Sequence, residues 1–116
     1  HTGIHPQPLA PVKCNKIDTG NIKIMDSKTN EVMDILQEEC AEVIQIVSKI
    51  RRFGIDEIHL KRGMSNREML CEEVGDVLCM IELLKELKII DGASIQSAVQ
   101  NKRKKLEQWS TIYESQ

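Results

Sequence analysis

The amino-acid sequence predicts an all-α protein, with two long antiparallel helices and a third helix forming a bundle. Three observations lead to this fold class. Apolar residues recur at helical spacing in three separate runs. Aromatic residues make up only 3% of the 116 residues, so the core must be aliphatic. No segment carries a convincing strand pattern. Because one copy would leave wide apolar faces uncovered, we expect self-association into a four-helix-bundle-like core.

The first long helix is expected to begin near Ser27 or Thr29, either of which could cap it, and to run to about Arg52. Gly54 follows a basic last turn, which is a common end signal for a helix. The apolar residues are spaced by three and four and occupy one face. They are Met33, Leu36, Cys40, Val43, Val47 and Ile50, widened on one side by Val32, Ile35 and Ile46.

The second long helix follows a connection over residues 55–65, in which a short turn of helix is expected at Asp56–Leu60. Ser65 or Asn66 caps this helix, which reaches roughly Lys88. Its apolar face repeats the design of the first. The residues are Leu70, Val74, Val77, Ile81 and Leu84, widened by Met80 and Leu87.

The third helix follows a break at Asp91-Gly92, begins near Ala93 or Ser94 and runs to about Tyr113. Residues 1–25 hold all three prolines and read as a flexible tail, native or added for expression. Residues 26–116 are therefore expected to form one all-α domain.

Two acidic blocks of the same design lie in the two long helices: Glu38-Glu39-Cys40-Ala41-Glu42 and Glu72-Glu73-Val74-Gly75-Asp76. At about 100° per residue, Glu39 falls inside the apolar arc of its helix, and Glu42 falls at the edge of that arc. Glu73 and Asp76 take the same two places on the second helix. Glu38 and Glu72 point away from the arcs.

These placements predict a divalent metal site between the two helices. Acidic blocks usually lie on solvated faces, but a carboxylate on an apolar face is costly unless it is paired or bound to a cation. Four acids in matching positions therefore favour facing helices that converge on a metal. Mg²⁺ is the natural candidate because it prefers oxygen ligands and bridges to substrate phosphates. Gly75, in mid-helix, suggests that a helix or ligand approaches closely there.

Composition bounds the function further. The formal net charge of −2 gives no basic surplus, so neither a nucleic acid nor a membrane surface is an expected partner. The four cysteines contain no CxxC pair, which argues against a zinc site and a disulfide framework. The sequence contains no apolar run long enough to span a bilayer and no signal peptide. A cytoplasmic location is the expectation.

The acidic blocks carry a family resemblance. The segments LQEECAEVIQ and LCEEVGDVLCMIELL resemble the MazG-like nucleoside triphosphate pyrophosphohydrolases, an all-α superfamily that includes dimeric dUTPases and phosphoribosyl-ATP pyrophosphohydrolase. The family pattern is ExxE on one helix and ExxD on the next, over about residues 30–108 of this chain. The resemblance implies Mg²⁺-dependent hydrolysis of a nucleoside triphosphate to monophosphate and pyrophosphate, with Mn²⁺ as a substitute ion, in a homodimer or homotetramer that clears unwanted nucleotides.

The resemblance also implies roles for individual residues. Glu39, Glu42, Glu73 and Asp76 would hold the metal, and one carboxylate among these or the flanking Glu38 and Glu72 would activate water. The catalytic candidates are Glu38, Glu39 and Glu72. In the third helix, Asn101, Lys102 and Lys105 are expected to contact phosphates, although a solvated helix face explains this run equally well. Lys61 and Arg62 of the connection could also reach phosphate, but a surface role is favoured for them.

Two other functional interpretations of the sequence compete with a pyrophosphohydrolase. A ferritin-like di-iron protein would need a histidine three residues after a glutamate on two helices, and neither block has one. A non-enzymatic helical interaction or regulatory module would explain the apolar faces, but it does not explain why Glu39 and Glu73 lie inside them. Base preference, dimer against tetramer and the number of metal ions stay open.

Overall fold

The computed structural model describes residues 25–114 and confirms the all-α prediction. The element order is α1 (Ser27–Phe53), β1 (Ile58–His59), β2 (Met64–Ser65), α2 (Asn66–Glu86) and α3 (Gly92–Trp109). The chain divides between Leu87 and Lys88 into two units, one with α1, the hairpin and α2, and the other with α3. Across the described residues, no helix combines the length and apolar character needed to cross a bilayer.

Helix α1 is capped by Asp26, one residue before Ser27 and three before Thr29, the two predicted caps. The Asp26 carboxylate accepts a hydrogen bond from the backbone N–H of Thr29 at 2.7 Å. An acidic N-cap also suits the positive end of the helix dipole. Gly54 ends the helix as predicted, because it adopts φ +99° while its N–H donates to the Ile50 carbonyl at 2.8 Å.

Helix α2 begins with a reciprocal cap. The Ser65 hydroxyl accepts a hydrogen bond from the Glu68 N–H at 3.1 Å, and the Glu68 carboxylate accepts from the Ser65 N–H at 3.2 Å. Two backbone donors at the start of the helix are thereby satisfied. Ser65 was one of the two predicted caps, and the helix ends at Glu86, two residues before the predicted Lys88.

Replacing Ser65 with alanine is expected to lower the free energy of unfolding by about 1 kcal/mol, because the Glu68 N–H loses its acceptor at a buried helix start. Chemical denaturation of the folded protein measures this change. Ser48→Ala is the matched control, since Ser48 is exposed in the interior of α1 and alanine is the better helix former. Equal stability of the two variants would contradict a capping role.

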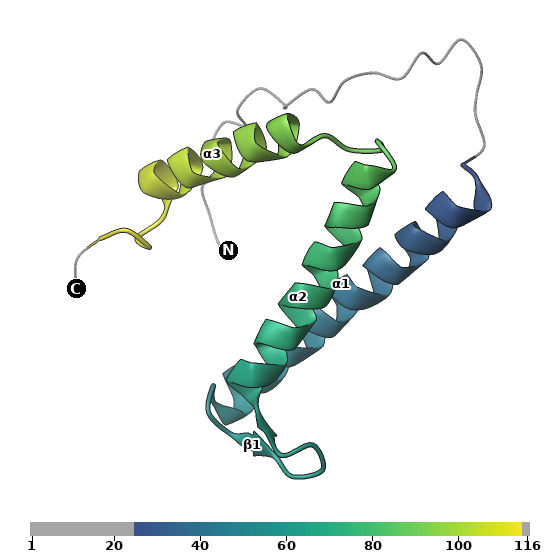
Figure 1. The fold of residues 1–116 in the computed structure, drawn as a ribbon. Coiled ribbons are helices and arrows are strands. Elements are labelled where there is room, and N and C mark those ends of the chain that lie inside the picture. The colour runs from purple at the N-terminus through teal and green to yellow at the C-terminus, as the bar shows by residue number, and fades with distance from the viewer. Residues whose placement is uncertain (1–24, 115–116) are drawn as a thin grey trace. The chain divides into compact units, whose positions relative to one another are not determined.

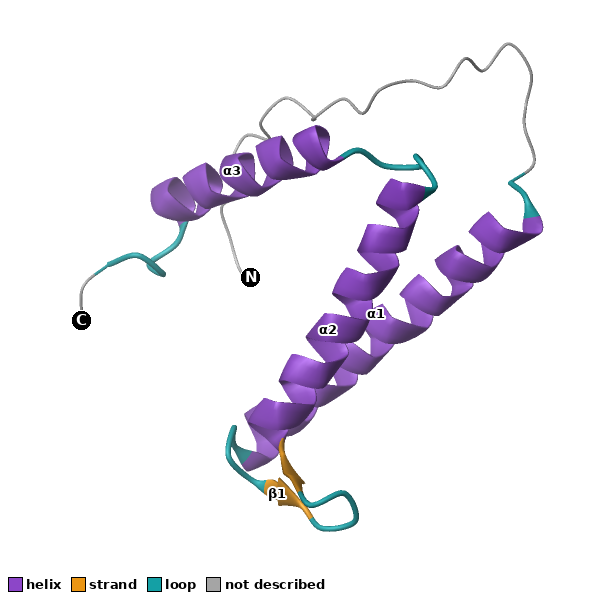
Figure 2. Cartoon of the chain, in the orientation of Figure 1, coloured by secondary structure: helices purple, strands orange, loops and turns teal. Residues whose placement is uncertain are grey.

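The connection between the long helices is a β-hairpin, so the predicted turn of helix at 56–60 is wrong. β1 and β2 pair antiparallel, with Ile58 opposite Ser65 and His59 opposite Met64 (Figure 2). At the tip, the N–H groups of Arg62 and Gly63 both donate to the His59 carbonyl, at 3.2 and 2.8 Å. Gly63 adopts φ +64°, a conformation that side chains rarely tolerate, and this closes the turn.

Helices α1 and α2 lie antiparallel and side by side, joined at one end by the hairpin (Figure 1). The apolar side chains buried in the chain come from both helices: Val32, Ile46, Met69 and Leu84. Part of each predicted stripe stays exposed, since Val47 and Val74 are both 41% exposed. The helices therefore pack along one edge of their apolar faces, the edge on which the acids lie.

Gly75 does not lie against another part of the described chain, contrary to the expectation of a close approach. A Cβ built at Gly75 would meet no heavy atom within 4 Å. Gly75→Ala is therefore expected to raise the free energy of unfolding by about 0.5–1 kcal/mol, since alanine favours a helix and has room here. Thermal unfolding measures the change. A loss of stability would show instead that another molecule approaches Gly75.

In the other unit, helix α3 is capped by Asp91, whose side chain accepts from the Ser94 N–H at 3.0 Å. The predicted break at Asp91-Gly92 thus becomes the helix start, one residue before Ala93. The helix ends at Trp109, and the Ser110 N–H donates to the Leu106 carbonyl at 2.9 Å. The predicted end near Tyr113 lies four residues too late, with Tyr113 in a turn beyond the helix.

Candidate functional site

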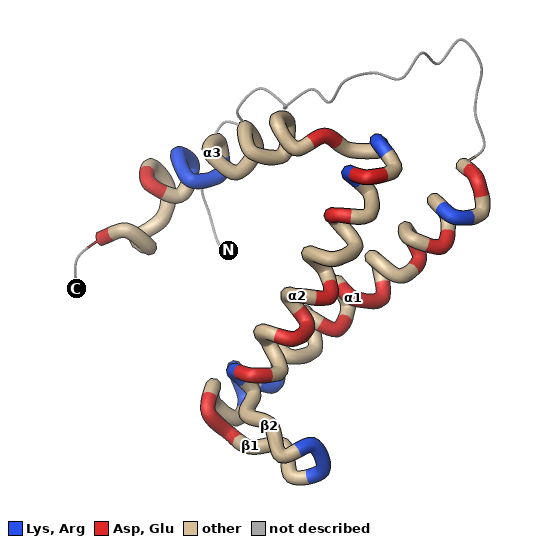
Figure 3. Tube along the Cα trace, viewed as in Figure 1, with Lys and Arg blue, Asp and Glu red and all other residues tan. Residues whose placement is uncertain are grey.

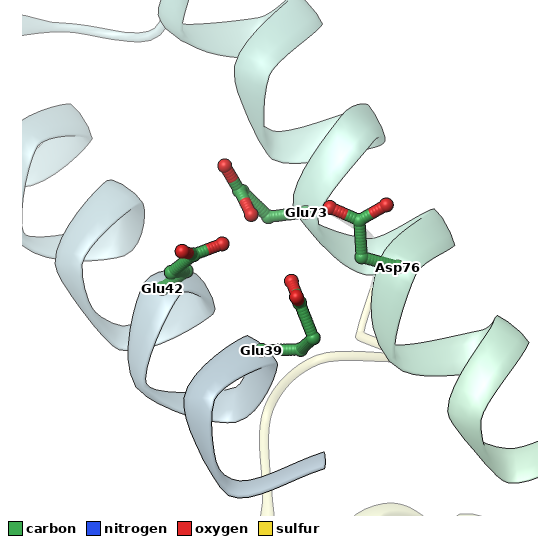
Figure 4. Close-up of side chains that lie close together, drawn as sticks. All are labelled: Glu39, Glu42, Glu73 and Asp76. Atoms are coloured by element: carbon green, nitrogen blue, oxygen red, sulfur yellow. The ribbon is translucent and has the colours of Figure 1, made fainter. Parts of the chain in front are cut away.

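The four acids predicted as metal ligands come together between α1 and α2. Glu39 and Glu42 lie one turn apart on α1, and Glu73 and Asp76 lie one turn apart on α2, so each pair projects from one helix face. Figure 4 shows the four carboxylates converging. One oxygen from each residue lies within 4.8 Å of the corresponding oxygen of every other. We refer to this group as the four-acid cluster.

The pKa is raised for two members of the four-acid cluster, Glu73 and Glu39. The pKa of Glu73 rises to about 7, chiefly through a hydrogen bond with Glu42, with burial and the charges of Glu42, Asp76 and Glu39 adding to it. The pKa of Glu39 is also raised, first by burial and then by the hydrogen bond and charge of Glu42. Without a cation, these carboxylates therefore resist full ionisation.

Two oxygen atoms in the four-acid cluster lack hydrogen-bond partners. Glu39 Oε2 and Glu73 Oε2 are both inaccessible to solvent, and nothing in residues 25–114 donates to them. A buried, unsatisfied carboxylate oxygen is costly, and a bound cation would satisfy both. Carboxylate oxygens are also the ligands that Mg²⁺ prefers in proteins. The residues present thus fit a hard divalent cation.

The flanking acids differ from the four-acid cluster and from each other. Glu38 is exposed on α1. Glu72 is partly exposed on α2 and is paired with Arg62, whose Nη2 lies 3.0 Å from Glu72 Oε1 and 3.2 Å from Oε2. As the sequence predicted, neither joins the convergence of Glu39, Glu42, Glu73 and Asp76.

The predicted phosphate-contacting residues Asn101, Lys102 and Lys105 lie on α3, in the other unit. They fall within four residues of one another along the helix, and Lys102 is exposed. Their contact with phosphate stays a prediction.

Sequence reasoning missed the pairing of Arg62 with Glu72. A surface role was favoured for Arg62, because the connection carried no signal for a hairpin. A contact that one long arginine side chain makes across a turn produces no repeating pattern in the sequence. The one available signal was Gly63, which follows Arg62 and permits the tight turn.

Comparison with known families agrees with this geometry. The model of the MazG nucleotide pyrophosphohydrolase domain matches residues 27–110, which include both acidic blocks and α3. No curated protein matches the chain in the corresponding comparison, and no solved structure does either. Since the match covers most of the sequence, the chain belongs to the MazG nucleotide pyrophosphohydrolase family.

Proposed function

We propose that this protein hydrolyses nucleoside triphosphates to the monophosphate and pyrophosphate, with Mg²⁺ held by Glu39, Glu42, Glu73 and Asp76. One observation carries the proposal. Four carboxylates converge from two facing helices, and two of their buried oxygens have no hydrogen-bond partner among the described residues. Membership of the MazG family supplies the reaction class. Mn²⁺, which also favours oxygen ligands, is expected to substitute.

The four carboxylates act by binding and orienting. Their oxygens gather at one place between two helices, where they would hold and orient a cation. A Mg²⁺ ion held there would neutralise charge that develops on the phosphates and polarise a water molecule for in-line attack. Glu73, whose pKa is raised to about 7, would lose its proton in holding the cation.

Activation of the attacking water falls to one of Glu38, Glu39 and Glu72. Glu39 belongs to the four-acid cluster, whereas Glu38 and Glu72 flank it. The three are distinguished by replacing each with glutamine. The general base is the residue whose replacement lowers kcat while the affinity for Mg²⁺ is retained.

Asn101, Lys102 and Lys105 are proposed to contact the phosphate chain of the substrate. Amide and ammonium groups within one turn of a helix supply donors at spacing that suits phosphate oxygens. The domain that carries this function is proposed to span residues 26–116, with residues 1–25 as a tail. Residues 1–24 lie outside the described part of the chain.

Self-association is part of the proposal. Helices α1 and α2 leave large apolar side chains exposed, including Ile44 at 70% and Leu78 at 54%, together with Val47 and Val74. By helical rotation, Ile44 and Leu78 lie on the sides of α1 and α2 that face away from the four-acid cluster. A homodimer or homotetramer would cover them. Sedimentation equilibrium tests this, and a single species of 13.2 kDa would contradict it.

The proposed role is removal of unwanted nucleotides in the cytoplasm. A reducing compartment suits the three free thiols in the described chain, Cys40, Cys71 and Cys79. Which base or sugar is preferred is decided by assay.

The test is product analysis by phosphorus NMR, using a panel of ribo- and deoxyribonucleoside triphosphates with Mg²⁺ and with EDTA. We expect monophosphate and pyrophosphate in equal amounts, with no diphosphate, and no turnover in EDTA. Release of inorganic phosphate and diphosphate would contradict the proposed bond cleavage. No turnover of any nucleotide by folded protein that also ignores Mg²⁺ would favour a non-enzymatic interaction module.

A further inference from the structure

Arg62 is paired with an acid that adjoins the four-acid cluster in the sequence. Its Nη2 donates to both carboxylate oxygens of Glu72, at 3.0 and 3.2 Å, and Glu72 directly precedes Glu73 on α2. The pKa of the Arg62 guanidinium is raised, first by the hydrogen bond and charge of Glu72, and also by the charge of Glu73. The guanidinium therefore interacts with its partner Glu72 and, more weakly, with one member of the four-acid cluster.

The guanidinium of Arg62 keeps most of its donors free. An arginine offers five N–H groups, and Glu72 engages only Nη2. Neither Nε nor Nη1 has a partner in residues 25–114, and the side chain is 42% exposed. The N–H groups of Nε and Nη1 are therefore available to a ligand, while Nη2 is anchored by Glu72.

Arg67 on the same segment provides a contrast. Its Nε lies 3.0 Å from Asp56 Oδ1, and its Nη2 lies 3.3 Å from Asp56 Oδ2. This is the two-pronged arrangement in which a guanidinium edge is fully used by one carboxylate. Arg67 thus has the geometry of a structural ion pair, whereas the contact of Arg62 through Nη2 alone leaves the N–H groups of Nε and Nη1 free.

Backbone hydrogen bonds of the hairpin fix the position of the Arg62 main chain. Arg62 lies at the tip of the β1–β2 hairpin, where its own N–H and that of Gly63 donate to the His59 carbonyl. At the base of the hairpin, the Asn66 N–H donates to the Glu57 carbonyl at 2.9 Å. Figure 3 shows Lys and Arg at the tip of the hairpin, at one end of the α1–α2 pair, and Asp and Glu at positions along both helices. The side chain then reaches back from this tip to Glu72.

We propose that Arg62 is a substrate-binding residue whose free Nε and Nη1 donors bind oxygens of the phosphate chain, while Glu72 holds the guanidinium in position through Nη2. This inference rests on the proposed function, because it places a polyphosphate at the four-acid cluster. The chemistry is complementary: a cluster of four acids repels a triphosphate, and the N–H donors of a guanidinium would offset that repulsion. Glu72 is then a positioning residue.

The experiment measures binding and turnover separately. Inorganic tripolyphosphate, with Mg²⁺ present, is titrated calorimetrically into wild type, Arg62→Gln, Arg67→Gln and Glu72→Gln, and KM and kcat are measured for the best nucleotide. In Arg62→Gln we expect the Kd for tripolyphosphate and the KM to rise about 10-fold or more, the value of a charge-assisted hydrogen bond. Arg67→Gln, which loses an ion pair of similar length, should stay within about twofold of wild type.

Two further readouts separate phosphate binding from a structural role. The affinity for Mg²⁺ without phosphate should be unchanged in Arg62→Gln. Arg62→Lys should recover only part of the loss, since an ammonium cannot hold Glu72 and phosphate with the separate, fixed donors of a planar guanidinium. Glu72→Gln should raise the KM less than Arg62→Gln does. If Glu72→Gln and Arg62→Gln instead lower kcat equally and leave tripolyphosphate binding intact, Arg62 acts only through Glu72, and the inference is overturned.

Failure of this inference differs from failure of the proposed function. Wild type, Arg67→Gln and Arg62→Gln with equal turnover and equal tripolyphosphate binding would overturn the inference and leave the pyrophosphohydrolase intact. No turnover of any nucleotide would refute the proposed function. No binding of tripolyphosphate to wild type with Mg²⁺ would overturn the inference whatever the turnover.

Discussion

Glu73→Gln is expected to lower the rate of pyrophosphate release by at least about 100-fold at wild-type Mg²⁺ concentrations. Glutamine keeps the size and shape of the side chain but removes an anionic ligand from the centre of the four-acid cluster, where Glu73 Oε2 has no other partner in residues 25–114. The loss should be accompanied by a higher Mg²⁺ requirement, measured as the half-saturating metal concentration in the same assay.

Glu82→Gln is the matched control for this substitution. Glu82 is an exposed glutamate on the same helix and lies outside the four-acid cluster. It should retain wild-type turnover and wild-type Mg²⁺ dependence. A Glu73→Gln variant that turns over within about threefold of Glu82→Gln would contradict a ligand role for Glu73, because loss of a directly bound ligand costs more than that.

The second large effect is on stability as a function of pH. In the folded protein the pKa of Glu73 is raised to about 7 from an ordinary value of 4.5. Between these values the folded chain keeps a proton that the unfolded chain has lost, so stability falls as pH rises. Without divalent metal, the melting temperature should therefore decrease from about pH 5 to about pH 7.5. Glu73→Gln should flatten this slope, and Glu82→Gln should not.

Mg²⁺ is expected to oppose the loss of folding stability at high pH. The cation binds the ionised carboxylates, so it stabilises the folded state more at pH 8 than at pH 5.5. At a concentration 100 times its Kd, a cation adds about 2.7 kcal/mol, which corresponds to several degrees in melting temperature for a domain of this size. Thermal unfolding with Mg²⁺ and with EDTA measures both effects. A melting temperature that ignores Mg²⁺ at pH 8 would contradict the metal site.

Helical periodicity was sufficient to predict the four-acid cluster. Glu39 and Glu73 fall within apolar arcs, and an apolar arc must face another element, so acids inside two such arcs are brought towards each other. The spacing of three residues to Glu42 and Asp76 then places a second acid on each facing surface. The convergence of one oxygen from each side chain within 4.8 Å follows from this pattern.

Helical periodicity could not predict which residues of a wide apolar face pack against the other helix. Val32 and Ile46, expected at the margin of the α1 stripe, are the buried residues, whereas Val47 at its centre is 41% exposed. The spacing of apolar residues gives the width of the apolar face, but that width does not reveal how many helices pack against it. Measurements of the oligomeric state are therefore needed to find what covers the exposed part of the α1 face.

The hairpin was missed for a different reason. Its strands contain two residues each, too few for an alternating pattern. The pairing depends on backbone hydrogen bonds at the tip and on the left-handed conformation of Gly63. The contact of Arg62 with Glu72 depends on that tip, so it was equally invisible in the sequence.

Metal binding by the four-acid cluster is tested most directly by anomalous diffraction from crystals grown with Mn²⁺ in place of Mg²⁺. We expect an anomalous peak among Glu39, Glu42, Glu73 and Asp76, with oxygens of both helices as ligands. We expect no such peak in Glu73→Gln crystals grown in parallel. Full occupancy at another position, or no peak among these carboxylates at millimolar Mn²⁺, would contradict it.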